Sequence, residues 1–124
     1  MQEQLNSHIL LLASWNRTGS TGIITGKFLE YMMIKKPIIC TITGNLPNSD
    51  LKQMIKHANI GVTWEEANNE NDYPILKNYI YNQYVRYKEG IPLLFEPNLE
   101  YIEKFNYKNL INNFINIINN LHRI

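Results

Sequence analysis

The chain contains a single cysteine, Cys40, and only 2 aspartates among its 124 residues. One cysteine excludes an internal disulfide framework, and the 3 histidines stand far apart, with no Cys/His cluster of the kind that holds structural zinc. An excess of one charge sign is also missing, since 12 basic residues face 11 acidic ones. This near-neutral balance argues against a nucleic-acid binder, whose affinity comes mainly from clustered positive charge.

Long hydrophobic runs and targeting signals are absent too. No apolar stretch approaches the roughly 20 residues that span a bilayer. Residues 1–4 are polar and include Glu3, which is unlike a secretory signal. We therefore expect a globular, cytoplasmic domain, and the length suits one compact unit with its own core.

The pattern of apolar residues predicts alternating strands and helices. Three short apolar runs bounded by turn residues predict strands over residues 9–13, 37–42 and 60–64. Apolar residues at helical spacing predict a helix that starts at Thr25 or Gly26 and a second helix that is capped by Ser49 or Asn48 and ended by Gly61. Further helices are predicted over residues 74–89, 98–105 and 108–122.

This order of elements predicts the fold class. Strands that alternate with helices are parallel and joined by right-handed crossovers. We expect an α/β fold, a Rossmann-like open parallel sheet of about three strands with helices on both faces and a helical C-terminus. Residues 1–124 would form one partial domain of this kind. The run at residues 9–13 shows no polar alternation, so we expect that strand to be buried on both faces.

A glycine-rich loop, residues 19–27, lies between the first strand and its helix and reads GSTGIITGK. It matches neither the Walker pattern, since Thr21 and Phe28 replace a glycine and a hydroxyl, nor the dinucleotide pattern GxGxxG. A glycine-rich loop at a helix N-terminus nevertheless offers free N–H groups and a positive dipole end to a diphosphate. The alternative is an ordinary strand-to-helix turn in which the glycines serve only geometry.

Glu30 follows Gly26 by one helical turn, on the same helix face. Its carboxylate can point back toward the helix N-terminus, past a residue without a side chain. Because a carboxylate only accepts hydrogen bonds, a pair of ribose hydroxyls is a natural partner. The alternative is a surface ion pair with Lys27, which contributes only a few tenths of a kcal/mol.

The strand at residues 9–12 followed by Ser14, then residues 22–32 (GIITGKFLEYM), then residues 36–39 (KPII), resembles the donor-binding motif of group 1 glycosyltransferases with the GT-B fold. The resemblance implies that the loop and helix N-terminus hold the diphosphate of a nucleotide-sugar, and that the glutamate binds the ribose. The donor-binding residues it implies are Ser14, Gly22, Thr25, Gly26, Lys27 and Glu30. Gly22 stands where the family commonly has a first glutamate, and Lys35 stands where glycine is commoner.

The resemblance covers nearly the whole chain, but only residues 9–44 match the family specifically. It implies part of the donor domain of a hexosyltransferase of bacterial surface-polysaccharide biosynthesis, acting in the cytoplasm with its parent at the inner face of the membrane. The nucleotide-sugar is substrate, and no cofactor or metal is expected. The acceptor domain is missing, so we expect no sugar transfer by this chain alone. The alternative is a non-catalytic α/β interaction or nucleotide-sensing module.

Two further segments bear on partners and on the surface. The strand at residues 9–13 carries no charge, proline or bulge signal, so its edge is unprotected, and we expect a homodimer through it. Glu65, Glu66, Glu70 and Asp72 form a small acidic segment, which we expect to be a solvated turn.

Overall fold

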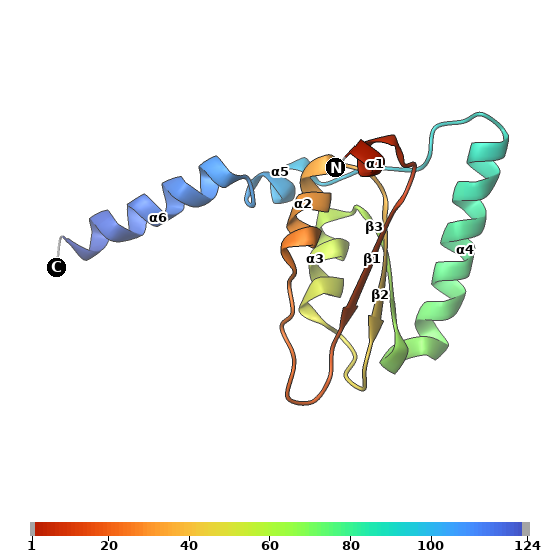
Figure 1. Cartoon of the computed structure of the whole chain (residues 1–124), viewed down its shortest axis with the longest axis horizontal. Helices are drawn as coiled ribbons and strands as arrows, with labels where there is room; N and C mark the ends of the chain where they lie inside the picture. The colour runs from red at the N-terminus through yellow and green to blue at the C-terminus, as the bar shows by residue number, and fades with distance from the viewer. Residues whose placement is uncertain (1, 123–124) are drawn as a thin grey trace.

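The computed structural model describes residues 2–122 and shows an α/β fold built on an open sheet of three parallel strands, in the order β1-β2-β3 (Figure 1). Leu10 of β1 pairs with Ile38 of β2, which in turn pairs with Gly61 of β3. The predicted Rossmann-like arrangement is therefore confirmed. The elements are α1 (Gln2–Asn6), β1 (Leu10–Trp15), α2 (Gly26–Ile34), β2 (Ile38–Thr43), α3 (Asp50–Ala58), β3 (Gly61–Glu65), a 3-10 turn η1 (Glu66–Asn68), α4 (Asn69–Lys88), α5 (Leu99–Glu103) and α6 (Tyr107–Leu121).

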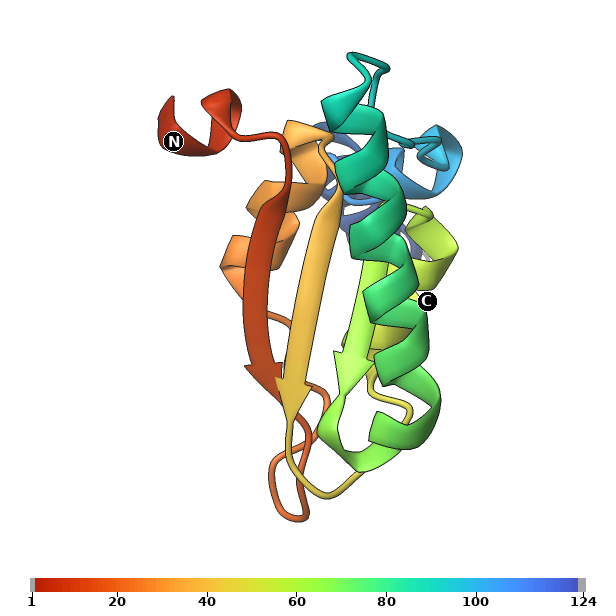
Figure 2. The ribbon, with the colours of Figure 1, turned by 90° about the vertical axis from the view of Figure 1, so that its right-hand side faces the viewer.

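Helices lie on both faces of the sheet (Figures 1 and 2). Helices α2 and α3 cover one face, and α4 runs along the other face in front of β3. One hydrophobic core fills the layer between the sheet and the first helix pair, with Phe28 and Met32 of α2 and Ile55 of α3 almost fully buried. Ile102 of α5 completes this core and is itself 0% exposed.

Strand β1 is not buried on both faces, which corrects the expectation from its uninterrupted apolar run. Leu10 and Leu12 are 3% and 5% exposed, whereas Leu11 is 70% exposed. The reason is the position of β1 at the edge of the sheet, since α4 covers the same face only over β3 (Figure 2). The uninterrupted apolar run at residues 9–13 therefore did not reveal that one face of β1 is open.

Helix ends follow local capping chemistry, with one correction. Helix α3 ends at Ala58, not at Gly61, because Asn59 adopts the left-handed conformation (φ 52°) and caps it. Gly61 instead opens β3, where a Cβ atom would overlap the backbone of Ile38. Helix α4 begins at Asn69 and runs through Pro74, ahead of the predicted start at residue 74.

Helix α6 projects away from the rest of the molecule on the side of α2 and α3 (Figure 1). Every side chain described from Lys108 to His122 is exposed, including an apolar stripe with Leu110, Phe114 and Ile117. Among residues 2–122, no helix combines the length and the apolar character needed to cross a bilayer.

Candidate functional site

Thr25 caps the N-terminus of α2, at the end of the glycine-rich loop. Its backbone is extended (φ −83°, ψ 152°), and its hydroxyl oxygen accepts the N–H of Phe28 at 3.2 Å. Phe28 is 0% exposed and anchors this first turn in the core. The cap leaves the first N–H groups of the helix, those of Gly26 and Lys27, without partners inside the helix.

Gly26 opens α2 with free space beside its backbone. A Cβ atom built at Gly26 would meet no heavy atom within 4 Å. A ligand can therefore approach the backbone of this turn closely, where the positive end of the helix dipole and the free N–H groups favour an anion.

The charged candidates Lys27 and Glu30 are both exposed on the first two turns of α2. The Lys27 ammonium lies 5.7 Å from the centre of the Tyr31 ring, a cation–π distance. Thr25, Gly26, Lys27 and Glu30 thus stand at one end of one helix, which presents N–H donors, a cation and a carboxylate to solvent.

Gly22 lies in the loop between β1 and α2, three residues before Thr25. Its φ of 68° is a left-handed conformation that favours glycine, and a Cβ atom there would meet Asp50 Oδ2 at 3.4 Å. Gly22 and Asp50 line a hollow of about 290 Å³ between the β1–α2 and β2–α3 loops. The residues Thr25 to Glu30 do not line this hollow.

Ser14 is 6% exposed and lies on the same face of β1 as the buried Leu10 and Leu12. Among the residues described, its hydroxyl oxygen has no hydrogen-bond partner. This oxygen is out of reach of solvent, so a ligand that contacts it must first displace its surroundings. Of the six residues predicted to bind the donor, Lys27 and Glu30 at the start of α2 have exposed, charged side chains, whereas the Ser14 side chain is buried.

A buried ionic network at the carboxyl end of β3 was missed by sequence reasoning. Glu65 is 0% and Asp72 3% exposed, so these two are not part of a solvated turn. Lys52 of α3 lies between them, with its Nζ 3.3 Å from Glu65 Oε1 and 3.0 Å from Asp72 Oδ1. A signal was present in the sequence, because Glu65 follows directly on the apolar strand, one position beyond its predicted end.

The Glu65 carboxylate also accepts the backbone N–H groups of Asn48 and Ser49, each at 2.9 Å. Burial by itself raises the pKa of Glu65, but these N–H groups and the Lys52 charge outweigh burial and hold the pKa below its ordinary value. Asp72 Oδ2 accepts the N–H of Glu65 at 2.9 Å. The network joins β3, the start of α3 and the start of α4, and its donors and acceptors are paired internally.

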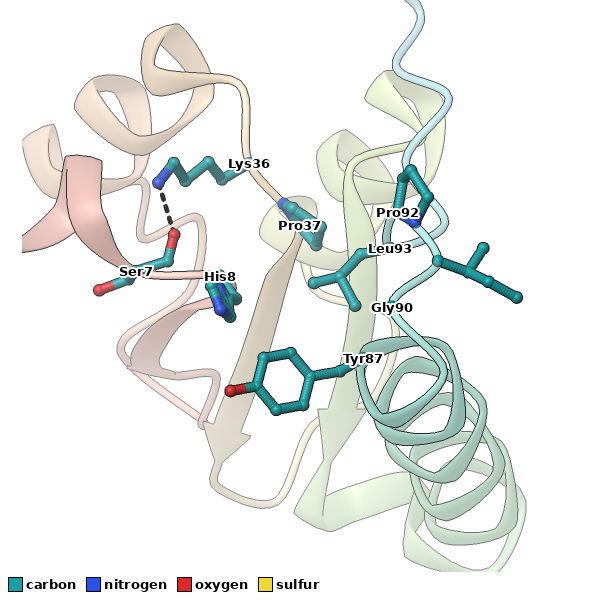
Figure 3. A pocket seen from close by; sticks show the side chains of 9 residues that line it. Ser7, His8, Lys36, Pro37, Tyr87, Gly90, Pro92 and Leu93 are labelled. Atoms are coloured by element: carbon teal, nitrogen blue, oxygen red, sulfur yellow. Dashed lines mark hydrogen bonds between the residues drawn. The ribbon is translucent and has the colours of Figure 1, made fainter.

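A hollow of about 530 Å³ lies at the amino end of the sheet (Figure 3). Its walls include His8 and Tyr87, whose rings are 5.1 Å apart, and Lys36, which donates to the carbonyl oxygens of Leu5 and Ser7. The Lys36 ammonium is therefore engaged with the backbone on the wall of this hollow. The hollow lies away from all of the residues that the sequence singled out for donor binding.

Comparisons with models of protein families, with curated proteins and with solved structures return no match for this chain. Within the described range, no three His, Cys, Asp or Glu side chains come together as a potential metal site. The start of α2 is therefore the candidate site on its geometry and chemistry alone.

Proposed function

We propose that this chain is the nucleotide-sugar-binding part of a glycosyltransferase, one that transfers a hexosyl residue in bacterial surface-polysaccharide biosynthesis. The observation that carries the proposal is the start of α2, where Gly26 has open space beside it and Lys27 and Glu30 are exposed on the same two turns. A nucleoside diphosphate presents the two chemistries that these groups complement, an anionic diphosphate and a ribose diol.

Each residue has a separate role in the proposal. The N–H groups of Gly26 and Lys27 donate hydrogen bonds to the diphosphate oxygens, and the Lys27 ammonium adds positive charge. Glu30 accepts hydrogen bonds from the ribose hydroxyls. As the sugar leaves, negative charge grows on the diphosphate, and fixed N–H dipoles stabilise it. This is electrostatic assistance to the leaving group and requires no general acid or base from this chain.

The proposal concerns a donor-binding part, so the acceptor and the second half of the active site come from elsewhere in the parent protein. Orienting donor and acceptor together is worth roughly 7–11 kcal/mol of the barrier in well-oriented systems. We therefore expect no transfer by the 124-residue chain alone. A donor-dependent glycosylated product formed by this polypeptide would contradict that expectation.

A cytoplasmic location and self-association belong to the same proposal. Cys40 is buried and free, as is usual for cysteines in a reducing compartment. β1 is an edge strand of the sheet, which supports a homodimer that uses the strand at residues 9–13.

Nucleotide titration followed by NMR tests the donor site. UDP, GDP and ADP are added separately, and we expect amide shifts to cluster over residues 25–30. Glu30→Ala should weaken binding by about 1–3 kcal/mol, the range for a hydrogen bond to a charged group. Glu89→Ala, which removes another exposed glutamate at the end of α4, is the matched control and should leave binding unchanged.

The outcome that would sink the proposal is a set of shifts centred elsewhere, or shifts that Glu30→Ala leaves unaltered. A non-catalytic nucleotide-sensing module would bind the same nucleotides. An assay of the whole parent protein distinguishes the two functions, because a sensing module would consume no nucleotide-sugar.

A further inference from the structure

The hollow of about 290 Å³ between the β1–α2 and β2–α3 loops, which we call the loop hollow, lies at the carboxyl end of the sheet (Figures 1 and 2). Open α/β sheets bind their ligands outside the carboxyl ends of the strands. Hydrogen bonds join the two loops. Leu46 donates its N–H to the Asn16 carbonyl at 3.2 Å, and Thr18 donates its N–H to Asn45 at 3.0 Å. The walls of the loop hollow are therefore held in place before a ligand binds.

Asp50, the first residue of α3, presents an exposed carboxylate on the wall of the loop hollow. The ion pairs found among residues 2–122 belong to Lys52 and do not include Asp50. Gly22 lies opposite, and a Cβ atom built there would meet Asp50 Oδ2 at 3.4 Å. The missing side chain at position 22 thus leaves open the space in front of this carboxylate.

Asn16 adds a second acceptor to the loop hollow, although its side chain belongs to a residue that is only 6% exposed. Its amide nitrogen donates to the Leu46 carbonyl at 2.9 Å and lies 3.4 Å from the Pro47 carbonyl. Because carbonyl oxygens only accept hydrogen bonds, these contacts fix which end of the amide is the nitrogen. Among the residues described, none donates to Asn16 Oδ1, so this oxygen keeps its capacity to accept.

The loop hollow therefore offers acceptors without a positive charge. Thr21 adds an exposed hydroxyl to the Asp50 carboxylate and Asn16 Oδ1. Of the described residues that line the hollow, none is basic. Such a set disfavours an anion and favours an uncharged group that carries several hydrogen-bond donors, which is the chemistry of sugar hydroxyls.

On the basis of the function proposed above, we propose that the loop hollow holds the hexosyl group of the nucleotide-sugar, and that Asp50 selects a neutral hexosyl group against a hexuronic acid. In a nucleotide-sugar the hexosyl ring is bonded directly to the diphosphate, so its pocket must adjoin the diphosphate site. Gly22 lies three residues before Thr25, and three residues span at most about 11 Å. One ligand can therefore reach both the loop hollow and the start of α2.

The size of the loop hollow suits one sugar ring. A water molecule takes about 30 Å³ of liquid volume, so a hollow of about 290 Å³ has room for roughly ten non-hydrogen atoms. A hexosyl group with its hydroxyls is of this size. Pockets for larger organic ligands span about 300–1,000 Å³, so the nucleoside does not fit in the hollow as well. The ribose and the diphosphate remain at the start of α2.

The selectivity follows from the charge of Asp50. Its carboxylate accepts hydrogen bonds from sugar hydroxyls, and such charge-assisted bonds are stronger than those between neutral groups. A hexuronic acid brings a second carboxylate into the hollow, where like charges repel and no basic wall residue offsets them. The same repulsion keeps the diphosphate at the start of α2, where N–H groups and Lys27 favour it.

Titration calorimetry of the full chain with three ligands tests the selectivity. The probes are UDP, UDP-glucose and UDP-glucuronic acid, with the corresponding GDP and ADP compounds. We expect UDP-glucose to bind about tenfold more tightly than UDP, and UDP-glucuronic acid to bind no more tightly than UDP. Asp50→Asn should weaken UDP-glucose binding about tenfold, spare UDP-glucuronic acid and leave UDP binding almost unchanged.

Glu70→Gln is the matched control. Glu70 is an exposed carboxylate in the first turn of α4 and does not line the loop hollow, so the loss of its charge should leave all three affinities unchanged. Circular dichroism checks that each variant folds. Thr21→Val is a second variant, which replaces a hydroxyl on the hollow by a methyl group of similar size. It should weaken UDP-glucose binding more than UDP binding.

The hexosyl pocket and the nucleotide site fail under different results. Equal binding of UDP-glucose and UDP-glucuronic acid would overturn the hexosyl pocket and leave the nucleotide site intact. An Asp50→Asn variant that weakens UDP as much as UDP-glucose would do the same. The NMR shifts that UDP-glucose adds to those of UDP should fall on residues 16, 21–22 and 48–50, and added shifts elsewhere would also overturn the pocket. If no nucleotide binds, the proposed function fails and the hexosyl pocket fails with it.

Discussion

The Glu65 carboxylate, at the end of β3, accepts the backbone N–H of Ser49, the residue that caps α3, at a distance of 2.9 Å. The Glu65 carboxylate also accepts the backbone N–H of Asn48, again at 2.9 Å. One buried carboxylate thereby fixes the loop that follows β2, although 16 residues separate Glu65 from Ser49 in sequence. The Lys52 ammonium, one turn into α3, balances that charge.

Replacing Glu65 by glutamine should destabilise the protein. Glu65→Gln keeps the shape but replaces one acceptor oxygen by a donor that faces an N–H group, and it leaves Lys52 with Asp72 as its only carboxylate in the network. We expect a loss of about 2–4 kcal/mol in the free energy of unfolding, measured by urea denaturation. Glu66→Gln is the matched control. Glu66 is exposed, and its carboxylate accepts the N–H of Gly44, so a change below about 1 kcal/mol is expected.

The stability contributed by Glu65 should depend on pH. Because the folded-state pKa of Glu65 lies below its ordinary value, the contribution is complete above the unfolded-state pKa of about 4.3. It is lost as the pH falls from there through the folded-state pKa. The difference in unfolding free energy between the unmodified chain and Glu65→Gln should therefore shrink as the pH falls below about 4.3 and on through the folded-state pKa. A difference that stays constant over this range would contradict the assignment.

Glycine at position 26 should matter for ligand binding and little for stability. Because a Cβ at Gly26 meets nothing within 4 Å, Gly26→Ala should change the unfolding free energy by less than about 1 kcal/mol. It should weaken nucleotide binding, since the methyl group occupies the space beside the first turn of α2. Gly61→Ala is the contrasting variant. Its Cβ would overlap the Ile38 backbone in the sheet, so we expect a strong loss of thermal stability instead.

Replacing Lys35 by glycine should increase the free energy of unfolding. It caps α2 in the left-handed conformation (φ 60°, ψ 57°), which costs a residue with a Cβ atom roughly 1–2 kcal/mol. Glycine also loses more chain entropy on folding, so we expect a net gain of about 0.5–1 kcal/mol for Lys35→Gly. Asn59→Gly is the control, because Asn59 has the same conformation at the end of α3 but donates its side-chain amide to the Glu96 carbonyl at 2.8 Å. No gain is expected there, and equal gains at both positions would contradict the account.

The sequence alone determined the elements whose cause is local. The caps at Thr25 and Ser49 follow from a hydroxyl that satisfies a nearby N–H. The sequence placed the start of the first helix at Thr25 or Gly26 and the cap of the second at Asn48 or Ser49, and the structure has α2 begin at Gly26 and Ser49 cap α3. The order of strands and helices, and with it the parallel sheet, follows from the spacing of apolar residues along the chain. The exposed polar groups at the start of α2 follow from the same local chemistry.

The tertiary structure decided which side chains those elements bury. Leu11 is as apolar as Leu10 and Leu12, yet only the packing of α4 over β3 leaves it exposed. Glu65 is as acidic as Glu66, yet it is buried because N–H groups of Asn48 and Ser49 and the Lys52 ammonium converge on it from a distant part of the chain. Capping and helical spacing depend on residues within one turn of each other and can be read along the chain, whereas burial depends on which elements meet in space.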